Sequence, residues 1–249
     1  MNFVDAATLA IPILFVTFLL LEWMIGGGRV FPRPKLWTLI GIGGFIVTGA
    51  VNALVPALIA PAFTAIHVSD LARWGLWAAA PAVVLTTFFT YWTHRLQHRY
   101  DVLWRLGHQL HHSVARVDVA SSAIFHPIDV FAQVAASTLA ATLLGVSAEA
   151  AALAGTIGFF FAVFQHWNIK TPRWIGLVVQ RPEAHCLHHE RDIHARNFGD
   201  ITWWDMMFGT YDNPENFKGA VGFEPARGRR VLAMIGCIDV NDTKNRAKL

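Results

Sequence analysis

Three short histidine motifs hold the side chains best suited to chemistry in this sequence. They are HRLQH at residues 94–98, HQLHH at 108–112 and HCLHH at 185–189, and they contain eight of the twelve histidines. Residues three or four apart share one face of an α-helix, so the first histidine of each longer motif can pair with either of the other two. The adjacent histidines diverge by about 100° and can reach two different ions. We therefore expect two metal ions held by imidazole nitrogens.

The ligand type does not select the metal, because imidazole binds zinc, copper, iron and nickel. The sequence has no HExxH motif of a zinc metalloprotease and no pair of Glu-x-x-His motifs of a carboxylate-bridged di-iron bundle. Haem ligation would need well-spaced single histidines and not adjacent pairs. A metal-sequestering loop would be of low complexity, whereas these motifs lie among Trp, Leu and Arg residues. A built di-metal site is the remaining interpretation.

Four histidines lie outside the three motifs. His126 in IFHPIDV precedes a proline where a helix would restart, and His166 in FQHWNIK ends a long apolar region. Both are expected near the motifs, and both are candidate ligands. His67 and His194 have no evident partner and are expected to be ordinary surface or packing residues. The two cysteines form no CxxC pair, so neither a disulfide framework nor a thiolate zinc site is indicated.

The composition indicates that membrane helices position these residues. The 249 residues are 54% hydrophobic and 15% charged, and the mean hydropathy is +0.41. Apolar stretches at residues 6–25, 36–60 and 74–92 are long enough to cross a bilayer. A further apolar region at 130–167, broken by GVSAEA, suits a helical hairpin that crosses twice or dips in and returns. We predict an all-α integral membrane protein with about four transmembrane helices and a histidine-rich helical cap.

The distribution of positive charge predicts which side carries the cap. The segment GGGRVFPRPK after the first stretch has three Lys or Arg residues, whereas the segment PAFTAIHVSDLAR before the third stretch has one. Cytoplasmic loops carry the excess of Lys and Arg, so the three histidine motifs are expected on the cytoplasmic side. The net charge of +3 comes without a basic run, and we expect no nucleic-acid partner.

The ordered motifs resemble one known family. HRLQH, LWRLGHQLHHS, FHP, QHWN, HCLHH and NFGDITWWDMMFGTY, in this order, resemble the fatty acid hydroxylase and sterol desaturase superfamily of integral-membrane di-iron enzymes, over residues 74–213. The resemblance implies a mushroom-shaped helical protein that uses O2 and two external electrons to hydroxylate or desaturate an unactivated C–H bond of a lipid. The implied cofactor is a pair of non-haem iron ions.

The resemblance also implies a ligand set. Some members have a further histidine after the QHWN motif, where this chain has Lys170, and this departure strengthens the case for His126 as the tenth ligand. The implied ligands are His94, His98, His108, His111, His112, His126, His166, His185, His188 and His189. Polar residues near them in sequence are expected to orient the imidazoles, and the candidates are Asp118, Asp129, Glu183, Glu190, Asp192, Asn197 and Asp200.

The resemblance divides the chain into three parts. Residues 1–73 would be N-terminal transmembrane helices, residues 74–213 the catalytic domain and residues 214–249 a cytosolic tail. The sequence shows no haem-attachment motif, no GxGxxG and no cysteine cluster for iron and sulfur. Electrons are therefore expected from a separate cytochrome b5-like protein, ferredoxin or flavin reductase. The bacterial inner membrane is the expected location, with the endoplasmic reticulum as the eukaryotic equivalent.

Two questions stay open at this point. The lipid substrate could be a sterol, a fatty acyl chain, a carotenoid or an aminolipid, and the oligomeric state is not indicated. The alternative function is a non-enzymatic membrane protein that binds or transports metal. A transporter should carry ionisable residues in the middle of its spans, whereas these spans have almost none apart from Glu22 near one end. The sequence therefore favours the enzyme.

Overall fold

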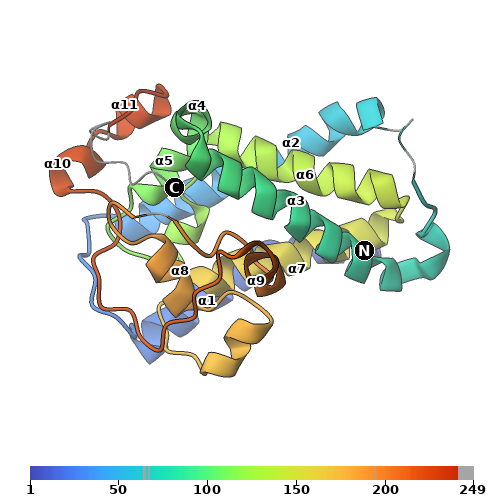
Figure 1. Ribbon diagram of the computed structural model, residues 1–249. Coiled ribbons are helices and arrows are strands. Elements are labelled where there is room, and N and C mark those ends of the chain that lie inside the picture. Colours follow the sequence, from blue (N-terminus) through green and yellow to red (C-terminus); the bar gives the residue numbers. More distant parts are fainter. Residues whose placement is uncertain (64–65, 67, 194, 241–249) are drawn as a thin grey trace.

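The computed structural model describes residues 1–63, 66, 68–193 and 195–240 of the chain. His67 and His194 lie outside the described residues. Five helices in this part are long and apolar enough to cross a membrane, which confirms an all-α integral membrane protein (Figure 1). They are α1 (Phe3–Ile25), α2 (Trp37–Phe63), the continuous pair η1 (Ala72–Ala78) and α3 (Ala79–Arg99), α6 (Pro127–Leu144) and α7 (Ala148–His166).

The apolar region after residue 126 forms a hairpin of two spans, so there are five candidate spans where about four were expected. Gly145 ends α6 in the left-handed region at φ 58°, and a Cβ there would lie 2.6 Å from the Ser69 carbonyl oxygen. Glycine therefore allows both the turn and the close approach. The Ser147 hydroxyl then accepts a hydrogen bond from the Ala150 N–H and begins α7.

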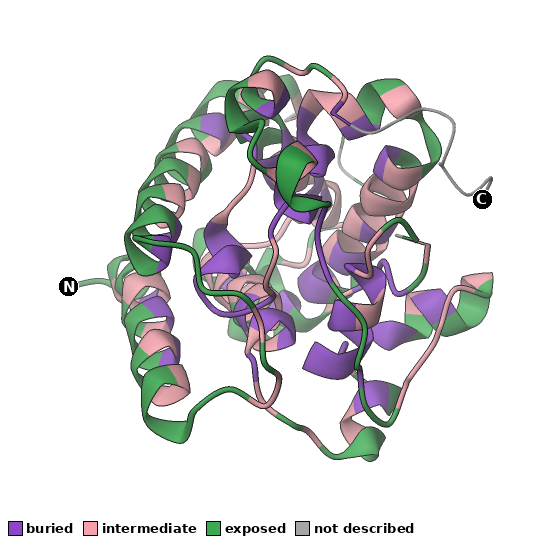
Figure 2. Cartoon of the chain, turned by 90° about the vertical axis from the view of Figure 1, so that its left-hand side faces the viewer, coloured by how far each residue is buried: buried purple, intermediate pink, exposed green. Residues whose placement is uncertain are grey.

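The spans pack in pairs, and the outer faces of α1 and α2 are exposed. The helix α6 packs against α2 and α3, and α7 packs against α1 and α3, so α3 lies between the two arms of the hairpin. Large apolar side chains on the outer faces of α1 and α2 are exposed, among them Leu9, Ile13, Leu54 and Leu58. Figure 2 shows exposed residues on the outside of the helices around a buried interior. Apolar exposure of this kind is what contact with lipid requires.

Short helices form a cap at one end of the spans. They are α4 (Asp101–Leu103), η2 (Trp104–His108), α5 (Gln109–His112), η3 (Ser121–Ala123), η4 (Arg173–Leu177), α8 (Pro182–His188), α9 (Thr202–Phe208), α10 (Pro225–Gly228) and α11 (Val231–Ile235). Most of them lie toward the left of Figure 1, whereas α9 lies alongside the middle of α3. Because η2 is a π-helical turn directly before α5, it shifts the register of the second histidine motif relative to a continuous α-helix.

The described part of the C-terminal segment packs onto this cap. Met234 of α11 is fully buried in a cluster with Trp104, Leu110 and Phe223. The Gln109 side chain donates a hydrogen bond to the Ile238 carbonyl oxygen at 2.9 Å. The segment therefore covers the outer side of α5, the helix that carries two of the candidate metal ligands.

Candidate metal centre

Nine of the ten predicted ligands lie in two groups in the cap. The five-imidazole group consists of His94, His98, His108, His112 and His188. The four-imidazole group consists of His111, His166, His185 and His189. Within each group one nitrogen of every ring lies within 4.8 Å of the others. The three motifs and His166 are thereby brought to two neighbouring points at the end of α3 and α7.

Helical spacing divides the motifs between the two groups. In the second motif, His108 and His112 point to the five-imidazole group, whereas the adjacent His111 points to the four-imidazole group. In the third motif, His185 and His189 share the four-imidazole group, whereas His188 joins the other. Histidines of one motif that share a group are therefore four residues apart. The sequence allowed the first histidine to pair with the one three or four residues later, and the structure has the spacing of four. The His112 and His189 rings stack at 4.1 Å and 17° where the groups touch.

Backbone carbonyls and one carboxylate fix the tautomers of three rings in the five-imidazole group. The Nδ1–H of His94 donates to the Phe198 carbonyl oxygen at 2.7 Å, and that of His188 donates to the Arg196 carbonyl oxygen at 2.6 Å. The Nδ1–H of His108 donates to the Asp129 carboxylate at 2.8 Å. In a neutral imidazole the second nitrogen then carries the lone pair, so Nε2 of each of these three rings presents an electron pair.

Neutral groups have the same role in the four-imidazole group. The Nδ1–H of His111 donates to the Ile124 carbonyl oxygen at 3.1 Å, and that of His166 donates to the Ala162 carbonyl oxygen at 2.7 Å. The amide nitrogen of Gln180 lies 2.7 Å from Nδ1 of His185, and the Gln180 amide oxygen has no partner among the described residues. A half-turn of that amide places the oxygen where it accepts from Nδ1–H of His185.

The distances between Nε2 atoms fit a bound cation. They are 3.3 Å for His111 and His166, 3.0 Å for His166 and His185, 3.1 Å for His185 and His189, and 3.0 Å for His112 and His188. Two lone pairs do not hydrogen-bond to each other. Metal–nitrogen bonds of about 2.1 Å give nitrogen pairs about 3.0 Å apart at right angles and about 3.4 Å apart at tetrahedral angles. The donor set therefore fits a divalent transition metal at each point.

Burial keeps these imidazoles in the form that binds metal. Desolvation holds the pKa of His111, His185 and His189 well below its ordinary value of 6.5, and the neighbouring imidazoles add to the effect. The three rings are therefore neutral near pH 7. Nε2 of His108 is buried without a partner among the described residues, as an unbound ligand atom would be.

Asp129 is the only one of the seven predicted orienting residues for which a hydrogen bond to a ligand ring is observed in the described chain. Gln97 and Gln133 donate to its other oxygen at 2.9 and 3.2 Å. Asn197 acts indirectly, since its side chain donates to the Ala184 carbonyl oxygen. Sequence reasoning missed Gln97 and Gln180, although Gln97 lies inside the first motif and was a visible polar candidate.

The aromatic segment after residue 196 positions the carbonyl acceptors. The Asp205 carboxylate accepts from the backbone N–H groups of Phe198 and Gly199 at 2.8 and 2.9 Å. This fixes the loop whose carbonyl oxygens hold His94 and His188. Trp203 and Met207 of α9 are exposed, and Trp204 packs on Phe88 of α3. The segment NFGDITWWDMMFGTY thus contributes packing and positioning contacts.

His126 does not join either group. It is the N-cap of α6, where its Nδ1 accepts from the Ile128 N–H at 3.2 Å. Its Nε2–H donates to the Ile235 carbonyl oxygen at 3.1 Å. Both ring nitrogens are therefore engaged in hydrogen bonds, and the structure does not bring His126 to either group. Lys170 is also remote from the groups, because it is exposed and lines a separate cavity.

The fold and the site define an integral membrane protein with histidines arranged for two metal ions at one end of its spans. The family model for fatty acid hydroxylase matches residues 79–210, which is more than half of the chain. The chain belongs to this family. It is therefore an oxidoreductase of the lipid-oxygenating kind.

Individual relatives agree with this assignment. The chain is 29% identical over 224 residues to ornithine lipid hydroxylase OlsE of Rhizobium tropici, covering 86% of this chain and 67% of the relative. It is 26% identical over 165 residues to human alkylglycerol monooxygenase, covering 61% of this chain and 36% of the relative. The corresponding Xenopus tropicalis protein is 28% identical over 145 residues, which is 30% of that relative's length. No solved structure matches the chain.

Proposed function

We propose that this protein is a membrane lipid hydroxylase that uses two non-haem iron ions. The overall reaction is RH + O2 + 2e⁻ + 2H⁺ → ROH + H2O, in which one oxygen atom enters a C–H bond and the other leaves as water. The observation that carries the proposal is the convergence of nine imidazoles on two points at the end of the spans. Family membership supports the lipid as the molecule oxidised.

The chain's own residues supply the setting for this chemistry. When bound, two redox-active iron ions would supply the activation of O2. The nine imidazoles would hold them, and carbonyl, carboxylate and amide partners of Nδ1 orient six of the nine rings. The four imidazoles of the second group are at most 2% exposed, which limits the contact of water with that group. Exclusion of water protects a strong oxidant from side reactions.

The lipid is proposed to approach from the side of α2 and α6. The Phe125 ring stacks on His111 at 4.0 Å and 9°. It also packs against a cluster formed by Val51, Val55 and Ile59 of α2 with Val130 and Val134 of α6. The four-imidazole group therefore borders the apolar interior between two spans. This arrangement supports a hydrocarbon substrate that reaches the site laterally from the bilayer.

For the substrate, an ornithine-type aminolipid is the first candidate, because the relative named an ornithine lipid hydroxylase covers most of this chain. Desaturation of a lipid chain is the second candidate reaction, since removal of two adjacent hydrogens uses the same oxidant and the same two electrons. We further propose that the cap faces the cytoplasm, where a separate electron-transfer protein supplies the electrons. The positive charge of the loop between α1 and α2 supports this orientation.

A test is expression in a bacterial host that makes ornithine lipids but does not hydroxylate them. Under 18O2 we expect a lipid heavier by one 18O atom, and no such product from His111→Ala. His126→Ala is the matched control, because that histidine lies outside both groups, and it should keep activity. A labelled product from His111→Ala would contradict the proposal. A chain that binds metal but yields no oxygen-dependent lipid would favour the alternative of a non-enzymatic metal-binding protein.

A further inference from the structure

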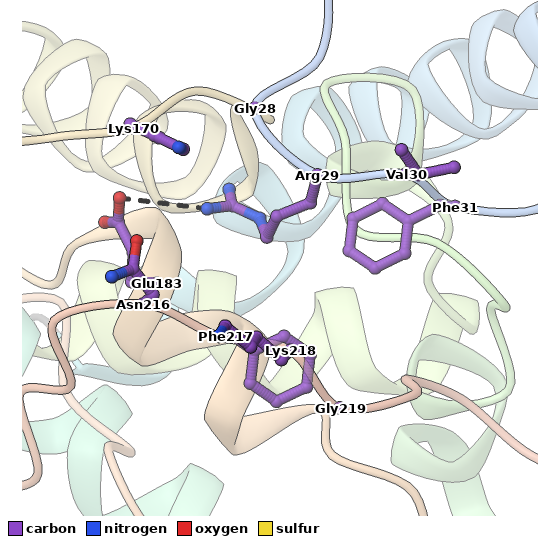
Figure 3. Close-up of a pocket in the computed structure, with 10 residues that line it drawn as sticks. All are labelled: Gly28, Arg29, Val30, Phe31, Lys170, Glu183, Asn216, Phe217, Lys218 and Gly219. Atoms are coloured by element: carbon purple, nitrogen blue, oxygen red, sulfur yellow. Dashed lines mark ion pairs between the residues drawn. The ribbon is translucent and has the colours of Figure 1, made fainter.

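A separate polar cavity lies on the far face of α8 from the histidines. Its volume is about 450 Å³. It is formed by the loop between α1 and α2, by Lys170 after α7, by Glu183 of α8 and by residues 216–219 (Figure 3). In α8, Glu183 faces this cavity and Cys186 packs in the cluster below it, whereas His185, His188 and His189 belong to the metal groups. The cavity is therefore distinct from the metal centre.

The lining of the cavity has more positive than negative charge. Arg29, Lys170 and Lys218 line it together with a single carboxylate, Glu183. That carboxylate is already engaged, because it accepts from the N–H and the hydroxyl of Thr171 at 2.8 and 2.7 Å and pairs with Arg181 at 3.2 Å. Neither lysine takes part in an ion pair among the residues that the structure describes. The two lysines thus lack an anion of their own, and Arg29 shares the Glu183 carboxylate with Arg181.

Arg29 is the least exposed cation in this lining, and its hydrogen-bonding groups are only partly satisfied. Its side chain is only 8% exposed, yet its guanidinium lies 3.8 Å from Glu183 and makes one long hydrogen bond of 3.4 Å to the Trp167 carbonyl oxygen. Its Nε has no hydrogen-bond partner within bonding distance in the described chain. The Cys186 thiol lies nearby, but sulfur is only a weak hydrogen-bond acceptor. A buried charge with unmet donors is costly. An anion in the cavity would satisfy it.

The loop that carries Arg29 is held in place before any ligand binds. The Arg29 N–H donates to the Asn168 side-chain oxygen at 3.0 Å, and the Asn168 side-chain nitrogen donates to the Arg29 carbonyl oxygen at 2.9 Å. A Cβ on Gly28 would lie 3.0 Å from the Lys170 backbone nitrogen, so glycine permits this close approach. The segment that carries Arg29 is thereby fixed at the edge of the cavity, which lowers the entropic cost of binding.

The position of the cavity relates it to lipid headgroups. The span α1 ends at Ile25 and α7 ends at His166, so Arg29 and Lys170 both lie one helical turn's worth of residues beyond an apolar span. This is the level of the polar headgroups, which extend several ångströms beyond a hydrocarbon core of about 30 Å. Basic pockets at this level bind anionic headgroups.

We propose that this cavity binds the phosphate or carboxylate group of an anionic membrane lipid. The apolar rings of Phe31 and Phe217 beside the cations suit a ligand that is anionic at one end and apolar at the other. A free phosphate ion shares the same chemistry, and the experiment below separates the two sources. The proposal does not depend on bound metal or on the proposed reaction.

The test compares the purified full chain with charge variants. The first variant is Arg29→Gln with Lys218→Gln. The second is Lys170→Gln with Lys218→Gln, which removes only exposed cations and keeps the fold intact if the loss of Arg29 disturbs it. The matched control is Arg33→Gln with Lys35→Gln, in the same loop but not lining the cavity. Retention of phosphatidylglycerol over phosphatidylcholine is measured by native mass spectrometry, and thermal stabilisation is measured with inorganic phosphate.

We expect the wild type and the control to retain phosphatidylglycerol and both cavity variants to retain at least tenfold less. Stabilisation by inorganic phosphate without lipid retention would support the same anion site with a soluble ligand. Equal retention and equal stabilisation in all four proteins would overturn the proposal. So would unchanged lipid retention with weakened binding of an acidic electron-transfer protein, because the surface would then belong to a protein partner. If the wild type binds lipid but does not oxygenate it, that result would count only against the proposed function.

Discussion

The two histidine groups differ in their number of imidazoles and in the charge behind them. The five-imidazole group has the Asp129 carboxylate on His108, and the four-imidazole group has backbone carbonyls and the Gln180 amide. A carboxylate partner raises the basicity of a ligating imidazole and offsets the charge of a metal ion. The first group would therefore hold a metal ion more firmly, and the second group would supply one imidazole fewer to its ion.

The surroundings of the two groups also differ. The four-imidazole group adjoins Phe125 and the apolar interior between α2 and α6. The five-imidazole group is enclosed by Trp104, by Phe198 and by the loop that Asp205 holds. We infer a division of roles, in which the first group anchors one ion and the second places its ion beside the lipid.

The largest expected effect follows from removing one ligand from each group. His112→Ala and His189→Ala alter the two rings that stack on each other at 4.1 Å, one in each group. Changes to residues behind the ligands already cost 10–100-fold, so we expect turnover to fall by more than about 100-fold in both variants. Metal content should fall from two ions per chain toward one. Elemental analysis and product assays measure both quantities.

The pH dependence of the metal-free chain should reflect the four-imidazole group. The folded pKa values of His111, His185 and His189 lie below the ordinary 6.5, so these rings take up protons mainly on unfolding. Stability is then full above pH 6.5 and falls as the pH drops below it, by at most about 1.4 kcal/mol per pH unit for each ring. Thermal melts in detergent between pH 8 and 5 measure this. His189→Gln should lower the slope by about one proton, and an unchanged slope would contradict this assignment.

The next effect concerns the carboxylate behind the five-imidazole group. Asp129→Asn keeps the shape of the side chain and removes its charge, and we expect a 10–100-fold loss of metal affinity or activity. The weakened ion should be the one in the five-imidazole group, which metal titration of the apo chain resolves as a shift in one of two binding steps. Asp118→Asn is the control, since Asp118 accepts from the Trp37 ring N–H and contacts no histidine among the described bonds. Equal effects of both changes would remove the special role of Asp129.

A smaller effect is expected at Gln180. Gln180→Leu removes the partner of His185 and should weaken the metal in the four-imidazole group by about tenfold. Gln180→Glu instead gives that group a carboxylate and should tighten its ion, which makes the two groups more alike. If both variants bind metal like the wild type, the amide does not orient His185.

The smallest effect is expected at His126. His126→Ala removes an N-cap and the hydrogen bond to Ile235, so the chain should lose about 1 kcal/mol of stability. Two metal ions per chain should remain. A drop to one ion would return His126 to the ligand set.

The sequence contained most of this arrangement because helical spacing is a strong constraint. The motifs together with His166 predicted the histidines that the two groups contain, and the apolar stretches predicted the candidate spans. It could not assign His126, because FHP places a histidine near the site whether its ring caps α6 or binds metal. It also gave no sign of Gln180 or of the carbonyls of Phe198 and Arg196, since those contacts depend on how distant loops fold over the motifs.

The most direct test of the central claim is the metal count of the active protein together with the source of the oxygen in its product. A preparation that converts a lipid under 18O2 should contain two iron ions per chain and should place one 18O atom in the product. X-ray absorption should show nitrogen ligands at about 2.1 Å around both ions. A fully active preparation with one metal ion per chain, or with zinc only, would contradict the account of two cooperating histidine groups.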